Sequence, residues 1–179
     1  RDPEFIALSG DAVGALGVTH YVYFVSGVGR ANDLARILEV EDPESAIIFC
    51  NTKSDVRYVT AFLQRRGYDA DQISGDLTQP AREKAMARIK AGKLRFLVAT
   101  DVAARGIDLP NLDLVIHADM PTNPDTLLHR SGRTGRAGRK GVCVLIVPVR
   151  RYPAAMRVLG FANAQGTARS APTAADIEA

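Results

Sequence analysis

Four short apolar runs, separated by segments of helical periodicity, constrain the fold of this chain more than any other feature. They are AIIFC (46–50), FLVAT (96–100), DLVIH (113–117) and VCVLIV (142–147). Continuous apolar runs of this length are typical of strands that are covered on both faces in a parallel sheet. Their alternation with helical segments predicts an α/β domain, with a mainly parallel sheet and helices on both of its faces.

The remaining segments complete this alternation. Two more strands are expected, a clear one at 18–25 (VTHYVYFV) and a weak one at 70–73. Helices are expected at 32–38, 80–91 and 152–162. A further helix is expected to begin after Ser54 as its N-cap and to stop at Gly67, and Gly92 is expected to end the 80–91 helix. Asn123 followed by Pro124 predicts another helix start.

The length of 179 residues suits one domain with short tails. We interpret the first five residues, RDPEF, as vector-derived and leave them out of the fold. Residues 6–163 form the predicted domain. From 164 to 179 the composition shifts to Ala, Thr, Ser and Pro, which is typical of a tail or a truncated linker.

Several classes of protein are disfavoured by what the chain lacks. No apolar stretch approaches the roughly 18 residues of a membrane span, and no secretory signal is visible. Cys50 and Cys143 each lie within an apolar run, which is typical of buried thiols in a cytosolic protein. No Cys/His cluster has metal-ligand spacing, so no metal site is expected in this chain. We therefore expect a cytoplasmic protein with no membrane partner.

The charge is unevenly distributed. Residues 1–44 contain eight acidic residues and three Lys or Arg, whereas 126–150 contains no acidic residue at all. Within that second segment lies HRSGRTGRAG (129–138), where arginines alternate with glycines. Such asymmetry indicates a surface that faces a polyanion, either nucleic acid or nucleotide phosphate, or simply a solvated basic face.

Polar residues follow three of the predicted strands. Asn51 and Thr52 follow AIIFC, Ser74 and Gly75 follow the weak strand, and Asp101 begins the polar stretch after FLVAT. In open α/β sheets, ligands bind at the carboxyl ends of the strands. These positions therefore predict one functional face, although each of them alone is also compatible with an ordinary loop.

The arginines of the basic segment can bind phosphate even though the chain has no P-loop sequence. If the helix that begins at Pro124 continues through it, His129, Arg133 and Arg136 share one face. The guanidinium group presents a planar fork of donors that matches phosphate oxygens. The chain contains no GxxxxGK[ST] loop, which would cradle a nucleotide.

Taken together, these stretches resemble the second RecA-like domain of DEAD-box RNA helicases, over roughly residues 18–162. IIFCNTK is similar to motif IV of that family, SGDLTQPAR to the QxxR segment, VATDVAARGID to motif V and HRSGRTGR to motif VI. One position departs from the pattern, because Ser74 stands where the family usually has histidine. The resemblance implies a RecA-like three-layer sandwich.

The resemblance also implies roles for individual residues. Arg133 and Arg136 would be arginine fingers that reach the γ-phosphate of ATP and stabilise charge on the transferred phosphoryl group. The nucleotide-binding residues would be Asp108 at the ribose, Gly106 and His129. The contacts to the RNA backbone would come from Thr52, Gly75, Arg82 and Thr100, with little base preference.

On this reading the chain is the C-terminal half of an ATP-dependent RNA helicase, inactive alone. The N-terminal RecA-like domain, with its P-loop and DEAD sequence, would hold most of the ATP and the magnesium ion. RNA and that domain are the expected partners, and closure of the two domains would complete the ATP site. Two alternatives stay open: a non-catalytic RNA-binding or interaction module with the same fold, and a DNA-directed helicase domain.

Overall fold

The structure is a computed structural model that describes residues 4–8, 18–27, 29–105, 107, 109–110, 112–131, 133–134, 141–161 and 166–170. Its strands are β1 (Glu4–Leu8), β2 (Val18–Val25), β3 (Ala46–Phe49), β4 (Ala70–Ile73), β5 (Phe96–Ala99), β6 (Leu114–His117), β7 (Gly141–Pro148) and β8 (Gly166–Ser170). Its helices are α1 (Arg30–Glu41), α2 (Lys53–Arg65), α3 (Gln79–Lys90), α4 (Asp101–Ala104), α5 (Pro124–Ser131) and α6 (Tyr152–Phe161), with a 3-10 turn, η2 (Val149–Arg151), before α6.

The strands form one sheet in the order β4-β5-β3-β6-β7-β2-β1-β8. The pairs from β4 to β2 are all parallel, and β3 lies between β5 and β6, with Ala46 opposite Phe96 on one side and Leu114 on the other. Every residue of β3, β5 and β6 is buried, which explains why these strands have no polar alternation. The predicted parallel α/β fold is confirmed.

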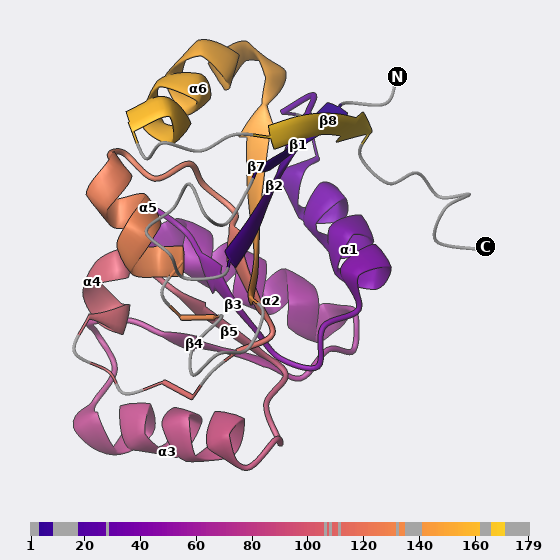
Figure 1. Cartoon of the computed structure of the whole chain (residues 1–179). Coiled ribbons are helices and arrows are strands. Elements are labelled where there is room, and N and C mark those ends of the chain that lie inside the picture. Colours follow the sequence, from indigo (N-terminus) through magenta and orange to yellow (C-terminus); the bar gives the residue numbers. More distant parts are fainter. Residues whose placement is uncertain are drawn as a thin grey trace.

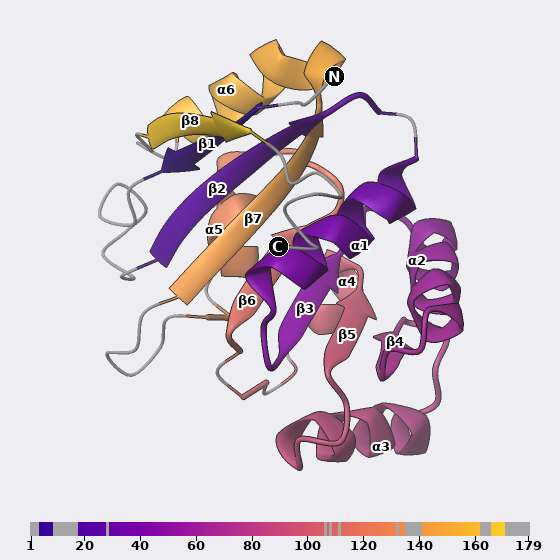
Figure 2. The same ribbon diagram turned by 90° about the vertical axis from the view of Figure 1, so that its right-hand side faces the viewer.

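Helices cover both faces of this sheet. Successive strand residues point to opposite faces, so Ile48 packs in the cluster that contains Leu34 of α1 and Val56 of α2, whereas Ile47 packs with Ala85 of α3. Figure 1 shows α1 to the right of the sheet and α4 and α5 to its left. Figure 2 shows α1 and α2 together beside the central strands. The result is a three-layer sandwich.

Glycine ends two helices as predicted, but one predicted start is wrong. Gly67 and Gly92 follow α2 and α3 with φ of 90° and 73°, a left-handed conformation that favours glycine. The N-cap of α2 is Thr52 rather than Ser54, and its Oγ1 accepts the backbone N–H of Asp55. Both residues can cap a helix, and the chain turn at the end of β3 selects the earlier one.

Two strands were not predicted. β1 pairs antiparallel with β2, with Phe5 opposite Tyr23, and β8 pairs antiparallel with β1, with Ala168 opposite Ile6. Glu4–Leu8 includes residues that we had set apart as vector-derived, and Gly166–Ser170 lies in the predicted tail. A strand at the margin of a sheet is held mainly by backbone hydrogen bonds, so periodicity gives little signal for it.

Among the described residues, no helix has both the length and the apolar run needed to cross a bilayer.

Candidate functional site

The ends of three neighbouring strands bring the predicted RNA-binding residues to one edge of the sheet. Phe49, Ala99 and Ile73 are aligned across β3, β5 and β4, and the N–H of Cys50 donates to the carbonyl of Ala99 at 3.0 Å. The next residues therefore leave the sheet side by side. Thr52, Gly75 and Thr100 all lie just beyond these aligned ends, as their positions after the strands predict.

Two of these residues also shape the backbone. The Thr52 hydroxyl accepts the N–H of Asp55 at 3.1 Å and donates to the same residue's carboxylate at 3.0 Å. The Thr100 hydroxyl accepts the N–H of Ala103 at 3.3 Å at the start of α4. Each threonine thus fixes the helix start that follows its strand. These caps account for threonine at both positions independently of any ligand.

No contact within the fold requires glycine at position 75. A Cβ placed on it would meet nothing within 4 Å, and its φ lies outside the left-handed region. Any residue could adopt this backbone. The space beside the Gly75 Cα faces solvent, so an approaching molecule could contact the main chain directly.

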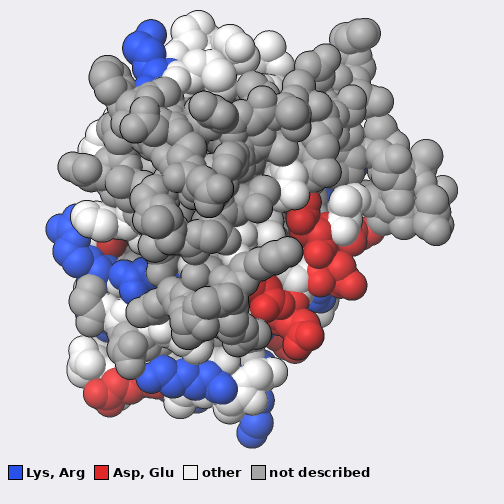
Figure 3. Space-filling view, in the orientation of Figure 1, with Lys and Arg blue, Asp and Glu red and all other residues white. Residues whose placement is uncertain are grey.

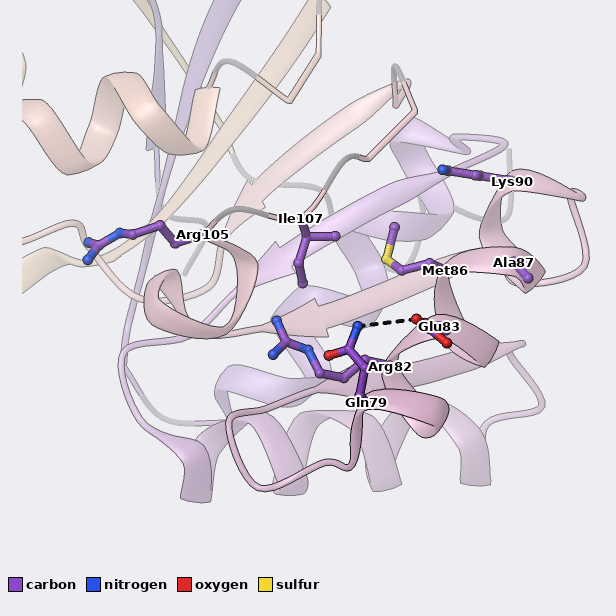
Figure 4. Close-up of a pocket in the computed structure, with 8 residues that line it drawn as sticks. All are labelled: Gln79, Arg82, Glu83, Met86, Ala87, Lys90, Arg105 and Ile107. Carbon is purple, nitrogen blue, oxygen red and sulfur yellow. Dashed lines mark hydrogen bonds between the residues drawn. The ribbon is translucent and has the colours of Figure 1, made fainter.

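Arg82 lies in a groove of about 630 Å³ between α3 and the residues that follow α4. Its Nη2 donates to the carbonyl of Ala103 at 3.1 Å, so the side chain spans from α3 to α4. Figure 4 shows Ile107 and Met86 above Arg82, whereas the Arg105 side chain extends away from them to the left. The groove thus places the Arg82 guanidinium beside the apolar side chains of Met86 and Ile107.

The buried centre of the site is Arg130, a residue to which sequence reasoning assigned no role. Its side chain is 1% exposed and makes two contacts with Asp101, Nε–Oδ1 at 2.6 Å and Nη2–Oδ2 at 2.7 Å. It also donates to the Asn51 side chain at 2.8 Å and to the Asp119 carbonyl at 2.9 Å, and it lies over the Phe49 ring. One guanidinium therefore ties the ends of β3, β5 and β6 to α5.

This network explains Asp101, which the sequence placed only at the start of the polar stretch after FLVAT. Both of its carboxylate oxygens accept from Arg130. A buried guanidinium needs such a partner. The sequence did contain a signal for this network. Asp101 and Asn51 each follow an apolar strand directly, and the basic segment supplies an arginine that could pair with them.

The expectation of one continuous helix through the basic segment is wrong in the described part. α5 ends at Ser131, and Arg133 lies in the following turn. Its Nη1 donates to the carbonyl of Ile107 at 3.3 Å. The N–H of Leu112 donates to the Arg133 carbonyl at 3.1 Å, and the Thr134 hydroxyl donates to the Leu112 carbonyl. Gly132 and the glycines beyond oppose helix propagation, and these contacts fix the chain in a turn instead.

His129 and Arg133 still come together. Both line a hollow of about 260 Å³, together with Arg105, Thr126 and the Arg130–Asp101 pair. His129 is exposed and Arg133 is half-buried. The geometry thus offers a cationic hollow of a size suited to a phosphate group. Arg136, Asp108 and Gly106 lie outside the described residues, so their predicted roles stay predictions.

Charge separates two sides of the molecule. Figure 3 shows most of the acidic side chains over α1 and the turn that follows it, and basic side chains near α3 and α4, where a smaller acidic group also lies. The acidic group includes the exposed residues Glu39, Asp42 and Glu44. Like charges repel, so a polyanion is favoured on the side of α3 and α4.

Neither cysteine is available for chemistry. Both Cys50 and Cys143 are buried, and neither forms a disulfide within the described residues. Burial raises the pKa of the Cys143 thiol to about 12, against a smaller lowering effect of its hydrogen bond with Ser131. Within the described ranges, no three side chains of His, Cys, Asp or Glu gather as metal ligands.

A parallel α/β sandwich with polar strand ends and a cationic hollow defines a RecA-like domain, and comparison with known proteins agrees. A model of the helicase conserved C-terminal domain matches residues 29–138, more than half of the chain. The chain belongs to this family, and within it to the C-terminal RecA-like domains of DEAD-box RNA helicases.

Individual relatives agree with this assignment. The chain is 42% identical over 147 residues to the ATP-dependent RNA helicase DbpA of Bacillus subtilis, a match that covers 82% of this chain and 31% of that protein. It is 40% identical over 150 residues to the ATP-dependent RNA helicase CshA of Listeria monocytogenes, covering 84% of this chain and 29% of that one. The chain thus spans about three-tenths of the length of these relatives.

Solved structures show the same fold. The E. coli DEAD-box protein SrmB, in complex with regulator of ribonuclease activity A, matches with a TM-score of 0.73 and 33% identity over 78% of this chain and 83% of that one. The C-terminal domain of the DEAD-box protein Dbp5 matches with a TM-score of 0.72 and 28% identity, covering 79% and 82%.

Proposed function

We propose that this chain is the C-terminal half of an ATP-dependent RNA helicase, in which it supplies an arginine finger and contacts to the RNA backbone. The observation that carries the proposal is the hollow that Arg133 and His129 line beside the buried Arg130–Asp101 pair. Its cations face a cavity in a chain whose sequence has no phosphate-cradling loop. The phosphate would therefore come with another domain.

The role of each part follows from its chemistry. Arg133, with Arg136, would stabilise negative charge that develops on the γ-phosphate during its transfer. Asp108, Gly106 and His129 would contact the nucleotide. The contacts of Arg130 hold the end of α5 in place, and His129 and Arg133 lie on the two sides of Arg130 in the chain. Their donors would therefore already be positioned when the two domains close around the nucleotide.

RNA would run along the aligned strand ends. Thr52, Gly75, Thr100 and Arg82 would contact its sugar–phosphate backbone, and the open space beside Gly75 supports close approach of that backbone. The N-terminal RecA-like domain would be the main partner and would hold ATP and its magnesium ion. Two buried thiols support a role in the reducing cytoplasm.

Arginine substitutions in the intact helicase test this proposal. Arg133→Gln and Arg136→Gln should each lower kcat for RNA-stimulated ATP hydrolysis by about 10³-fold or more, with RNA affinity largely retained. Arg65→Gln, an exposed change at the end of α2, is the matched control and should leave kcat unchanged. The chain alone should hydrolyse no ATP.

Other outcomes favour the alternatives. Unchanged ATP hydrolysis in both variants would contradict the arginine-finger role. RNA binding by an intact protein that has no ATPase activity would identify a non-catalytic binding module. Equal stimulation by DNA of the same sequence would identify a DNA-directed enzyme.

A further inference from the structure

A second groove, of about 380 Å³, opens at the carboxyl ends of β2, β7, β6 and β3. Gly27 follows β2, Arg150 and Arg151 follow β7, Asp119 follows β6, and Asn51 follows β3. None of the motif residues assigned to RNA or nucleotide above lines it. The groove nevertheless lies on the same edge of the sheet as those residues.

The cations of this groove come from η2. Arg150 and Arg151 are both exposed, and Val149 separates Arg150 from Pro148, the last residue of β7. Gly27 has a φ of +89°, and a Cβ on it would stand 2.6 Å from Arg150 Nη1. Glycine therefore leaves room for the Arg150 guanidinium to lie across the loop after β2. Two neighbouring guanidinium groups at the rim of a groove suit phosphate oxygens.

The part of the groove formed by the segments after β3 and β6 offers hydrogen-bond acceptors. Asp55 and Asp119 line the groove, and both carboxylates also bind motif IV: Asp55 accepts from the Thr52 hydroxyl at 3.0 Å, and Asp119 accepts from the Asn51 N–H at 2.8 Å. Carboxylates repel phosphate but accept a hydrogen bond from a ribose 2′-hydroxyl. A ligand with alternating phosphate and 2′-hydroxyl groups satisfies both walls.

The sheet order makes this groove a continuation of the RNA-facing edge. β3 is followed in the sheet by β6, β7 and β2. Phe49 at the end of β3 is level with His117 and, through it, with Leu145 of β7. Adjacent strands lie about 4.8 Å apart, so Leu145 lies about 10 Å from Phe49, and β7 continues three residues beyond that level to Pro148. A strand that passes Thr52 and continues across the sheet reaches Arg150 and Arg151 next.

We propose that this groove binds the sugar–phosphate backbone of the RNA strand beyond Thr52, with Arg150 and Arg151 contacting phosphate and Asp55 and Asp119 facing ribose. The inference rests on the proposed function, because it extends the same bound strand. It adds RNA contacts that lie outside the helicase motifs and that belong to the particular sequence after β7.

NMR titration of the isotope-labelled 179-residue chain locates the contact. Single-stranded oligouridine of about 12 nucleotides is the probe, with a strand of about 4 nucleotides for comparison. The longer strand should shift the amide signals of Gly27, Arg150 and Arg151 as well as those of Thr52, Gly75 and Thr100. Shifts confined to the second group would overturn the groove and leave the proposed function standing. An absence of shifts in both groups would overturn both.

The salt dependence of binding tests the phosphate contacts. Each lost phosphate contact on single-stranded RNA lowers the slope of log K against log salt by about 0.7. The double variant Arg150→Gln/Arg151→Gln should therefore lower that slope by about 1.4 and weaken binding of the longer strand on the order of tenfold at about 0.1 M salt. Arg65→Gln, at the opposite end of α2 from Thr52, is the control and should leave the slope unchanged.

Two further comparisons make the proposal falsifiable. Asp55→Ala/Asp119→Ala should reduce the preference of the groove for RNA over DNA of the same sequence, because both side-chain acceptors are lost. An unchanged salt slope in the double arginine variant, or equal shifts of the groove amides with DNA and RNA, would overturn the proposal. Circular dichroism of each variant verifies that the fold is retained.

Discussion

Arg130 and Asp101 meet through two parallel contacts, 2.6 Å and 2.7 Å long, although 29 positions separate them in the chain. The arginine is 1% exposed and the aspartate side chain 31%. The pair joins the start of α4 to α5, so it fixes the place from which His129 and Arg133 extend. The proposed arginine finger Arg133 thus extends from a position that a neighbouring structural arginine, Arg130, holds in place.

Removing this pair should destabilise the domain. Arg130→Met leaves Asp101 without its partner, and we expect the free energy of unfolding to fall by about 2–3 kcal/mol, less than for a fully buried pair because Asp101 is partly exposed. Arg130→Lys keeps the charge but loses the fork, so a smaller loss is expected. Urea denaturation measures both. A loss no larger than that of Arg65→Gln, expected within about 0.5 kcal/mol, would contradict the structural role.

The helix-capping role of Thr52 can be measured through the stability of the domain. Thr52→Ala should lower the free energy of unfolding by about 1 kcal/mol, because the Asp55 N–H loses its acceptor. Thr52→Ser retains the hydroxyl and should restore most of the stability. Thermal or urea unfolding of the two variants checks this expectation, and equal stabilities would show that the cap contributes nothing.

A substitution at Gly75, unlike Thr52→Ala, should leave stability almost unchanged. Because a Cβ meets nothing and the backbone is unstrained, Gly75→Ala should change the free energy of unfolding by no more than about 0.5 kcal/mol. If RNA approaches the main chain here, the same variant should bind single-stranded RNA more weakly. Fluorescence anisotropy measures the binding, and unchanged affinity would remove Gly75 from the RNA-facing edge.

Cys143 should make stability fall at alkaline pH. Its pKa is about 12 in the folded chain against an ordinary value of 9.0, so above pH 9.0 the unfolded chain loses a proton that the folded chain retains. Unfolding is then favoured increasingly as pH rises, by about 1.4 kcal/mol per pH unit for this one group.

Cys143→Ala isolates this effect. Its cavity lowers stability at every pH, but its stability should fall less steeply than that of the unmodified chain between pH 9.0 and about 12. Urea denaturation at several pH values gives both slopes. Parallel slopes would show that the thiol titrates alike in the folded and unfolded chains.

Much of the fold follows from local pattern. The runs at β3, β5 and β6 are apolar throughout because they are buried on both faces, and this signal survives without any knowledge of their neighbours. The same holds for Gly67 and Gly92, whose left-handed conformation ends a helix wherever it occurs. The sequence pattern did not indicate β1 and β8, because the antiparallel pairs that add them to the sheet depend on backbone hydrogen bonds, which any side chain allows.

The candidate site divides in the same way. Residue type and position after a strand were enough to place Thr52, Gly75 and Thr100 on one edge, since parallel strands end together. The partner of Arg130 and the turn at Arg133 could not be found from the sequence. Both depend on contacts between segments far apart in the chain: Asp101 with Arg130, and Leu112 with Arg133 and Thr134. Periodicity reports which side chains leave water, whereas only tertiary packing decides which buried charge meets which, because that choice depends on distance in space.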